Sequence, residues 1–163
     1  MTIRTIKAAL LSAVVLASGM AATSANAATA TATARANILR QLTVTRTADL
    51  DFGTIVTGAA AATVAVSSGG ARTCGAGLTC TGTVSAANFN VVGTVGSVVT
   101  TSVGGTVTLT SGGNNMTATL AGSGATITLD GTDDYAVGGT LSVGANQADG
   151  VYTGTFTATV NYQ

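Results

Sequence analysis

The feature that most constrains this chain is a period-two alternation of apolar and polar residues, which recurs in short runs along most of its length. Because neighbouring side chains of a strand point to opposite faces, such alternation predicts strands buried on one face. Turn-forming clusters of Gly, Ser, Asn and Asp separate the runs, for example at 111–115 and 130–133. The predicted strands are residues 63–67, 80–84, 89–92, 106–110, 116–120, 125–129, 140–143 and 151–162.

Short strands with frequent turns predict an all-β fold, a β-sandwich or a barrel. Composition agrees, because Thr, Val and Ile favour strands while the helix formers Glu, Lys, Leu and Gln are scarce. With 22 Gly and no Pro, the turns depend on glycine's access to positive φ. A Gly-rich solenoid is the competing architecture, but the Gly-Gly pairs follow no fixed period.

The first residues predict export. Arg4 and Lys7 precede an apolar stretch at 8–20, and Ala25-Asn26-Ala27 has the small-x-small form that signal peptidase cleaves. The stretch is shorter than the roughly 20 residues that cross a bilayer. We therefore expect a signal peptide at 1–27, cleaved after Ala27, export through the Sec route, transit through the periplasm and a final place at the cell surface or outside the cell.

The charge of the predicted mature chain, 28–163, excludes several function classes. It carries four Arg and six Asp, a net charge of −2, with no Lys, Glu or His. We expect no nucleic-acid or anionic-membrane partner. Without His there is no ordinary Ser-His or Cys-His pair, and no pair of facing carboxylates suggests sugar hydrolysis. The sequence thus predicts a protein that is not an enzyme and has no cofactor.

Two smaller motifs have a structural interpretation. Cys74 and Cys80 are the only cysteines, and in an oxidising compartment they predict a disulfide at the tip of a hairpin rather than a metal or redox site. Asp130, Asp133 and Asp134 resemble half of a calcium loop. The twelfth position counted from Asp130 is not Glu and the glycine is misplaced, so we interpret the cluster as a turn.

The segment that opens the mature chain, 28–44, is the most unusual. Its even positions are apolar up to residue 38, and Thr, Arg and Asn occupy the odd ones. This pattern predicts a strand with nothing in its own sequence to pair with, although a flexible Ala/Thr tail is an alternative. The residues of the apolar face are Ala28, Ala30, Ala32, Ala34, Ala36 and Ile38.

The last predicted strand, 151–162, places Tyr152, Phe156, Val160 and Tyr162 on one face and Thr or Asn on the other. Since the sequence ends directly after it, we expect this strand at an open sheet edge.

Two positions near the carboxyl end resemble subunits of the chaperone-usher pilins. Those subunits carry a penultimate Tyr and a Gly fourteenth from the end, and here the residues are Tyr162 and Gly150. The front half, with Leu50-Asp51-Phe52-Gly53, resembles the spore coat protein U-like exported domains and a neighbouring family of unknown function. One departure is that many such subunits have a cysteine where this chain has Leu42.

The resemblance implies an immunoglobulin-like sandwich at 39–163 that lacks its final strand. A periplasmic chaperone would fill the resulting groove beside Gly150, Tyr152, Phe156, Val160 and Tyr162, and an outer-membrane usher would then assemble the subunits. The donor segment, 28–38, of the next subunit would replace the chaperone, giving a surface fibre for adhesion or biofilm formation. The alternative is a self-contained surface sandwich that binds glycan or matrix as a coat or tip component.

Overall fold

The computed structural model describes residues 27–163, so the predicted signal peptide lies outside the described residues except for Ala27. The folded body comprises Asn37–Gln163. Its regular elements are all strands, and no helix that could span a membrane occurs between residues 27 and 163. The strands are β1 (Thr43–Ala48), β2 (Thr54–Val56), β3 (Ala62–Val66), β4 (Arg72–Cys74), β5 (Thr79–Thr81), β6 (Ala87–Val92), β7 (Val98–Val103), β8 (Thr106–Ser111), β9 (Asn114–Gly122), β10 (Thr126–Thr128), β11 (Asp133–Val143) and β12 (Ala158–Tyr162).

The larger sheet has seven antiparallel strands organised around β11. The first part of β11 pairs with β6 and its second part with β3, while β9 also pairs with it. Beyond β6 lies β1, beyond β3 lies β4, and beyond β9 lies β8. The first strand of the body, β1, therefore ends one side of this sheet.

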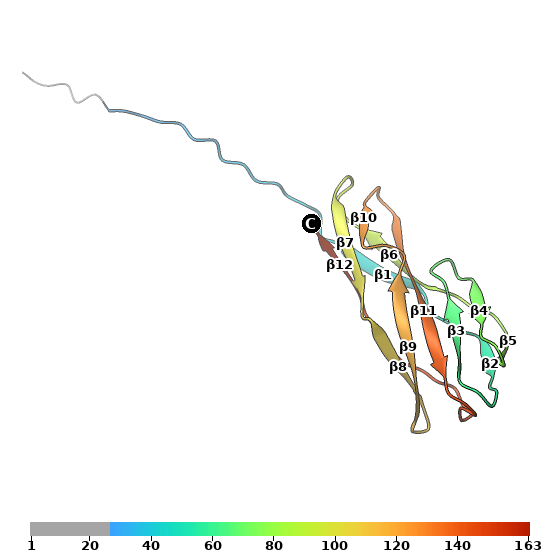
Figure 1. Ribbon diagram of the computed structural model, residues 1–163. Coiled ribbons are helices and arrows are strands. Elements are labelled where there is room, and N and C mark those ends of the chain that lie inside the picture. The colour runs from blue at the N-terminus through green and yellow to red at the C-terminus, as the bar shows by residue number, and fades with distance from the viewer. Residues whose placement is uncertain (1–26) are drawn as a thin grey trace, which may run out of the picture. The chain divides into compact units, whose positions relative to one another are not determined.

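The smaller sheet has the order β10-β7-β12. Only Gly104 and Gly105 separate β7 from β8. The chain then turns back, so that β9 pairs with β8 and β10 pairs with β7. β12 pairs with β7 and has no second neighbour among the described strands. A third, two-stranded sheet joins β2 and β5. Figure 1 shows β7, β10 and β12 toward one end of the body and β2, β4 and β5 toward the other.

The sheets enclose one apolar core. Its largest fully buried side chains are Tyr135, Leu129, Val64, Val91, Val99 and Val137. Burial raises the pKa of the Tyr135 phenol, and the side chain of Thr101 opposes that shift by hydrogen bonding. The predicted fold class is thus confirmed: the body is an all-β protein with the curled antiparallel sheets of a sandwich.

Some elements differ from the sequence prediction. The alternation did not predict β7, because a polar residue, Thr101, occupies one of its buried positions. The Thr101 hydroxyl is satisfied there by donating to the carbonyl of Gly124 (2.7 Å). The turn predicted at Asp133 and Asp134 is wrong, because both residues lie in the front part of β11. Asp residues are frequent in turns, which is why the sequence predicts one here. The strand expected at 151–162 is interrupted: Thr153 forms an isolated bridge with Thr110, and regular pairing begins at Ala158.

The disulfide between Cys74 and Cys80 is confirmed, with 6.1 Å between the Cα atoms. Its setting differs from the hairpin expected, because the two strands do not pair with each other. Cys74 lies in β4, which pairs with β3, and Cys80 lies in β5, which pairs with β2. The bond therefore links the large sheet to the two-stranded sheet.

Removal of this bond by Cys74→Ala with Cys80→Ala is expected to lower the free energy of unfolding by about 2.4 kcal/mol, from the chain entropy of so small a loop. Equilibrium denaturation of the variant and the parent measures the change. Alkylation of the denatured, unreduced parent should add nothing, and two added groups would contradict the disulfide.

A candidate strand-binding seam

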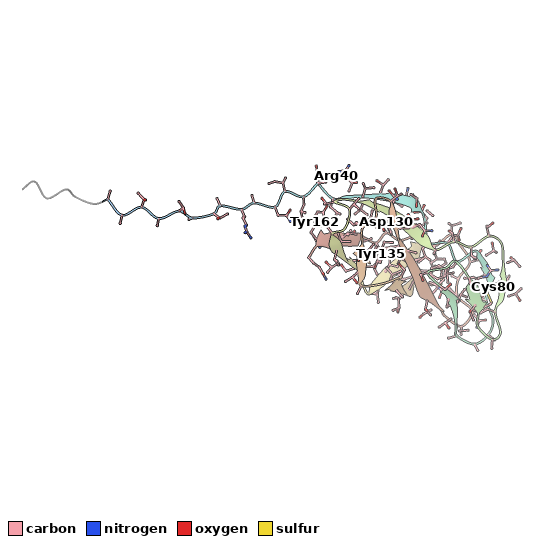
Figure 2. All side chains as sticks on the ribbon, turned by 90° about the horizontal axis from the view of Figure 1, so that it is seen from above. Arg40, Cys80, Asp130, Tyr135 and Tyr162 are labelled. Carbon is pink, nitrogen blue, oxygen red and sulfur yellow. A yellow bond between two sulfur atoms is a disulfide. The ribbon has the colours of Figure 1, made fainter. Side chains whose placement is uncertain are left out.

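Two segments far apart in sequence lie along one another at the open side of the body. They are residues 40–58, at its front, and residues 146–162, at its back, and we call the space that they flank the seam. At one end the Tyr162 hydroxyl donates to the carbonyl of Arg40 (2.9 Å), and at the other the N–H of Asn146 donates to the carbonyl of Gly58 (2.9 Å). Figure 2 shows Arg40 and Tyr162 together at one end of the body and Cys80 at the opposite end.

Between these two ties, no other hydrogen bond joins the segments within residues 27–163. β1 pairs only with β6 and β12 only with β7, so each presents a second edge without a strand partner in the described chain. Such edges carry rows of main-chain N–H and C=O groups that can template another strand. The seam is thus bounded by two sheet edges, one from each sheet.

A cleft of about 620 Å³, with both apolar and polar lining residues, lies in the seam toward the end marked by Gly58 and Asn146. One wall is 50–57 and the other is 147–152. Leu109, Met116, Leu141 and Val143 also line the cleft, and they come from β8, β9 and β11. The core of the sandwich is therefore accessible from this side.

The sequence Leu50-Asp51-Phe52-Gly53 builds the first wall. The Asp51 carboxylate accepts the N–H of Gly53 (2.8 Å), and Gly53 has φ of 76°, a conformation that glycine adopts without strain. Phe52 is buried in the core. The Arg72 guanidinium donates to the carbonyls of Phe52 (3.3 Å) and Thr81 (2.7 Å), which fixes this wall to β5.

The second wall contains Gly150 and Tyr152. The Tyr152 hydroxyl accepts a hydrogen bond from the Gln147 amide (2.8 Å) and donates to the carbonyl of Ala148 (2.9 Å), closing a small loop. Gly150 has φ of 148°, and a Cβ atom there would collide with the Ser111 side chain. A glycine is therefore required where the chain turns into the last segment.

The remaining predicted residues of the last segment face inward as the alternation implied. Phe156 packs edge-on against Phe89 of β6, with 6.3 Å between ring centroids, and Val160 is buried. The Tyr162 hydroxyl accepts the N–H of Thr94 (2.8 Å) while it donates to Arg40, so one phenol fastens β12 to both the front segment and the chain after β6. Thr155, Thr157 and Thr159, on the other face, are exposed.

Residues 28–38, predicted as a donor strand, form no strand and are exposed throughout. Their apolar face is therefore uncovered: Ala28, Ala30, Ala32, Ala34 and Ala36 are exposed, and Ile38 is 85% exposed. The first strand of the body, β1, begins only at Thr43.

The acidic residues serve local structure. Asp49 pairs with Arg46 (2.6 Å), and the carboxylate of Asp133, the first residue of β11, accepts the N–H of Asp130 (2.9 Å) in the turn before that strand. No group of three or more His, Cys, Asp or Glu in the described part of the chain is placed to hold a metal ion.

Sequence reasoning missed Arg72 and the floor of the cleft. The only available signal for Arg72 was its position as the one mature arginine outside the front of the chain. Its carbonyl acceptors come from residues 20 and 9 positions away, which no local pattern encodes.

Comparison with known proteins gives a family. The family described as "Domain of unknown function (DUF4402)" matches residues 42–162, and this chain belongs to it. The match covers the body from just before β1 to the end of β12. No curated protein and no solved structure matches.

Replacement of the phenol hydroxyl in Tyr162→Phe is expected to lower the free energy of unfolding by about 1–3 kcal/mol, because a half-buried N–H and a carbonyl lose their partner. Thr159→Ala, on the exposed face of the same strand, is the control and should change stability by less than about 0.5 kcal/mol. Equal stability of Tyr162→Phe and the parent in urea would contradict the fastening role.

Proposed function

We propose that this protein is the structural subunit of a surface fibre and that it polymerises by donor-strand exchange. The donor segment, 28–38, of one copy would enter the seam of the next copy and add a strand between β1 and β12. The observation that carries this proposal is the seam itself, where the unpaired edges of β1 and β12 lie toward one end and a cleft into the core opens toward the other, in a protein whose front segment is an exposed alternating strand sequence.

Strand addition suits both partners. Main-chain hydrogen bonds to a sheet edge supply affinity, and alternate side chains supply the fit to the cavity below. Burial of one large apolar side chain such as Ile38 contributes roughly 1.5–3 kcal/mol. The ladder would also remove two open edges, which otherwise promote aggregation.

The same contact explains a fibre rather than a closed oligomer. Donor and acceptor surfaces are different parts of the chain, so the interface is head to tail, and such interfaces propagate when the rotation does not close. A strand of eleven residues extends about 36 Å, and the last segment from Tyr152 to Tyr162 has the same number of residues.

The resemblance to chaperone-usher pilins supports the cellular route. On this proposal a periplasmic chaperone covers the seam during transit, an outer-membrane usher assembles the subunits, and the fibre serves adhesion or biofilm formation. The disulfide between Cys74 and Cys80 is consistent with an oxidising exported compartment.

A second candidate is a self-contained surface sandwich that binds glycan or matrix. The cleft favours it, because about 620 Å³ falls within the size range of small-molecule sites. In that case the cleft takes a ligand and residues 28–38 remain unused.

The two candidates differ in what residues 28–38 do for stability. Residues 39–163 alone should be poorly stable or dimer-prone, whereas the same chain with 28–39 fused after Gln163 through a short flexible linker should be a monomer that melts much higher and does not polymerise. The geometry permits this fusion, since Tyr162 lies at the end of the seam opposite the cleft. Melting curves and size-exclusion chromatography measure both properties.

Substitutions on the opposite face of the donor strand provide the matched control. Ala32→Asp or Ala34→Asp in the fused strand should abolish the gain in stability, whereas Thr31→Asp or Thr33→Asp should be tolerated, because alternate residues point to opposite faces. A truncated chain that already melts cooperatively as a stable monomer, with no gain from the fused strand, would favour the self-contained sandwich.

A further inference from the structure

We infer that the seam accepts the donor segment in a single register, with Ile38 in the cleft beside Tyr152 and Ala28 opposite Tyr162. This inference rests on the proposed function and goes beyond it, because it identifies which donor residue meets which acceptor residue. In this register each donor residue and the residue opposite it have numbers that sum to 190, so that Ala32 lies opposite Ala158.

The position of the cleft fixes the direction of the donor. Among residues 28–38 only Ile38 is a bulky apolar side chain. The cleft lies at the Gln147–Tyr152 end of the last segment. A donor antiparallel to that segment brings residue 38 to this end, whereas a parallel donor would bring it to Tyr162, where Leu42, Leu129 and Gly93 already pack closely.

The alternation of apolar and polar residues requires the two opposed residue numbers to have an even sum. Inward positions of the last segment are even numbers, including Phe156, Ala158 and Val160. Residues directly opposite in an antiparallel pair lie on the same face. A sum of 190 therefore places the whole alanine face of the donor inward, and a shift of one residue would place Thr and Arg there instead.

Side-chain size then selects among the even registers. In the chosen one, Ala34, Ala30 and Ala28 lie opposite Phe156, Val160 and Tyr162, where side chains already fill the space between the sheets. Ile38 lies where the space is unfilled. Small residues thus meet the filled part of the seam and the one large residue meets the cleft.

Charge agrees with this register. Arg40 of the incoming copy would lie opposite Gly150, near two carboxylates that line the cleft, Asp149 and Asp51. The main-chain N–H of Arg40 already donates to the Thr94 hydroxyl of its own chain (2.7 Å), so only Leu39 separates the donated residues 28–38 from the first residue tied to the donor's sandwich. Consecutive bodies would abut at the cleft end of the seam.

Disulfide trapping in the full chain tests the register. Ala32→Cys with Ala158→Cys should give intermolecular crosslinks when the assembled protein is oxidised with copper phenanthroline, seen as a ladder on non-reducing gels. Residues directly opposite are about 4.5–5.5 Å apart at Cα, within disulfide range. The matched controls, Ala30→Cys or Ala34→Cys with Ala158→Cys, place the pair at a diagonal and should crosslink at least tenfold less, because diagonal neighbours lie about 7–8 Å apart.

The outcomes separate the register from the proposed function. A ladder that is strongest with Ala30→Cys or Ala34→Cys would overturn the register while retaining strand exchange. Fibres of normal length with no ladder from any of the three pairs would overturn the register, and the melting comparison of the fused chain would then decide on strand exchange itself. A second measurement covers variants that fail to assemble: Ile38→Ala in the strand fused after Gln163 should remove most of the gain in melting temperature, whereas Leu39→Ala there should retain it, and the reverse result would overturn the placement of Ile38.

Discussion

Main-chain N–H and C=O groups at a sheet edge take their partners from water or from another strand, and in this protein two such edges flank the same seam. β1 and β12 each satisfy one side of their main chain and leave the other without a strand partner in the described chain. The proposed function follows from the simplest remedy, which is one more strand.

Strand pairing and side-chain hydrogen bonds in the rest of the body support both sides of this seam. β11 pairs with β6, β3 and β9, so it ties the large sheet together behind the seam. Arg72 fixes the first wall through two carbonyls, and Tyr162 ties the far end through its hydroxyl. A donated strand binds more tightly to a preformed site, since less ordering entropy is lost on binding.

Local patterns in the sequence predicted most of the sandwich and the open edge of the last segment, but not the cleft. Alternation located β3, β6, β8, β9 and β10, and it gave the inward face of the last segment, because burial on one face imposes period two. It failed for β7 and the front of β11, where Thr101 and the pair Asp133 and Asp134 occupy strand positions for reasons of long-range pairing. The cleft depends on residues from three separate regions of the chain, 50–57, 109–116 and 141–152, which no local pattern brings together.

Hydrogen exchange followed by mass spectrometry tests the addition of a strand most directly, since it reports main-chain hydrogen bonding in separate peptides. The full chain would be measured as isolated monomer and as purified fibre. Strand donation predicts that a peptide covering 28–38 exchanges quickly in the monomer and that peptides covering β1 and β12, each bonded on one side only, are partly protected there. All three should become more strongly protected in the fibre, while the central strand β11 is protected in both. Equal exchange of those three peptides in monomer and fibre would contradict it.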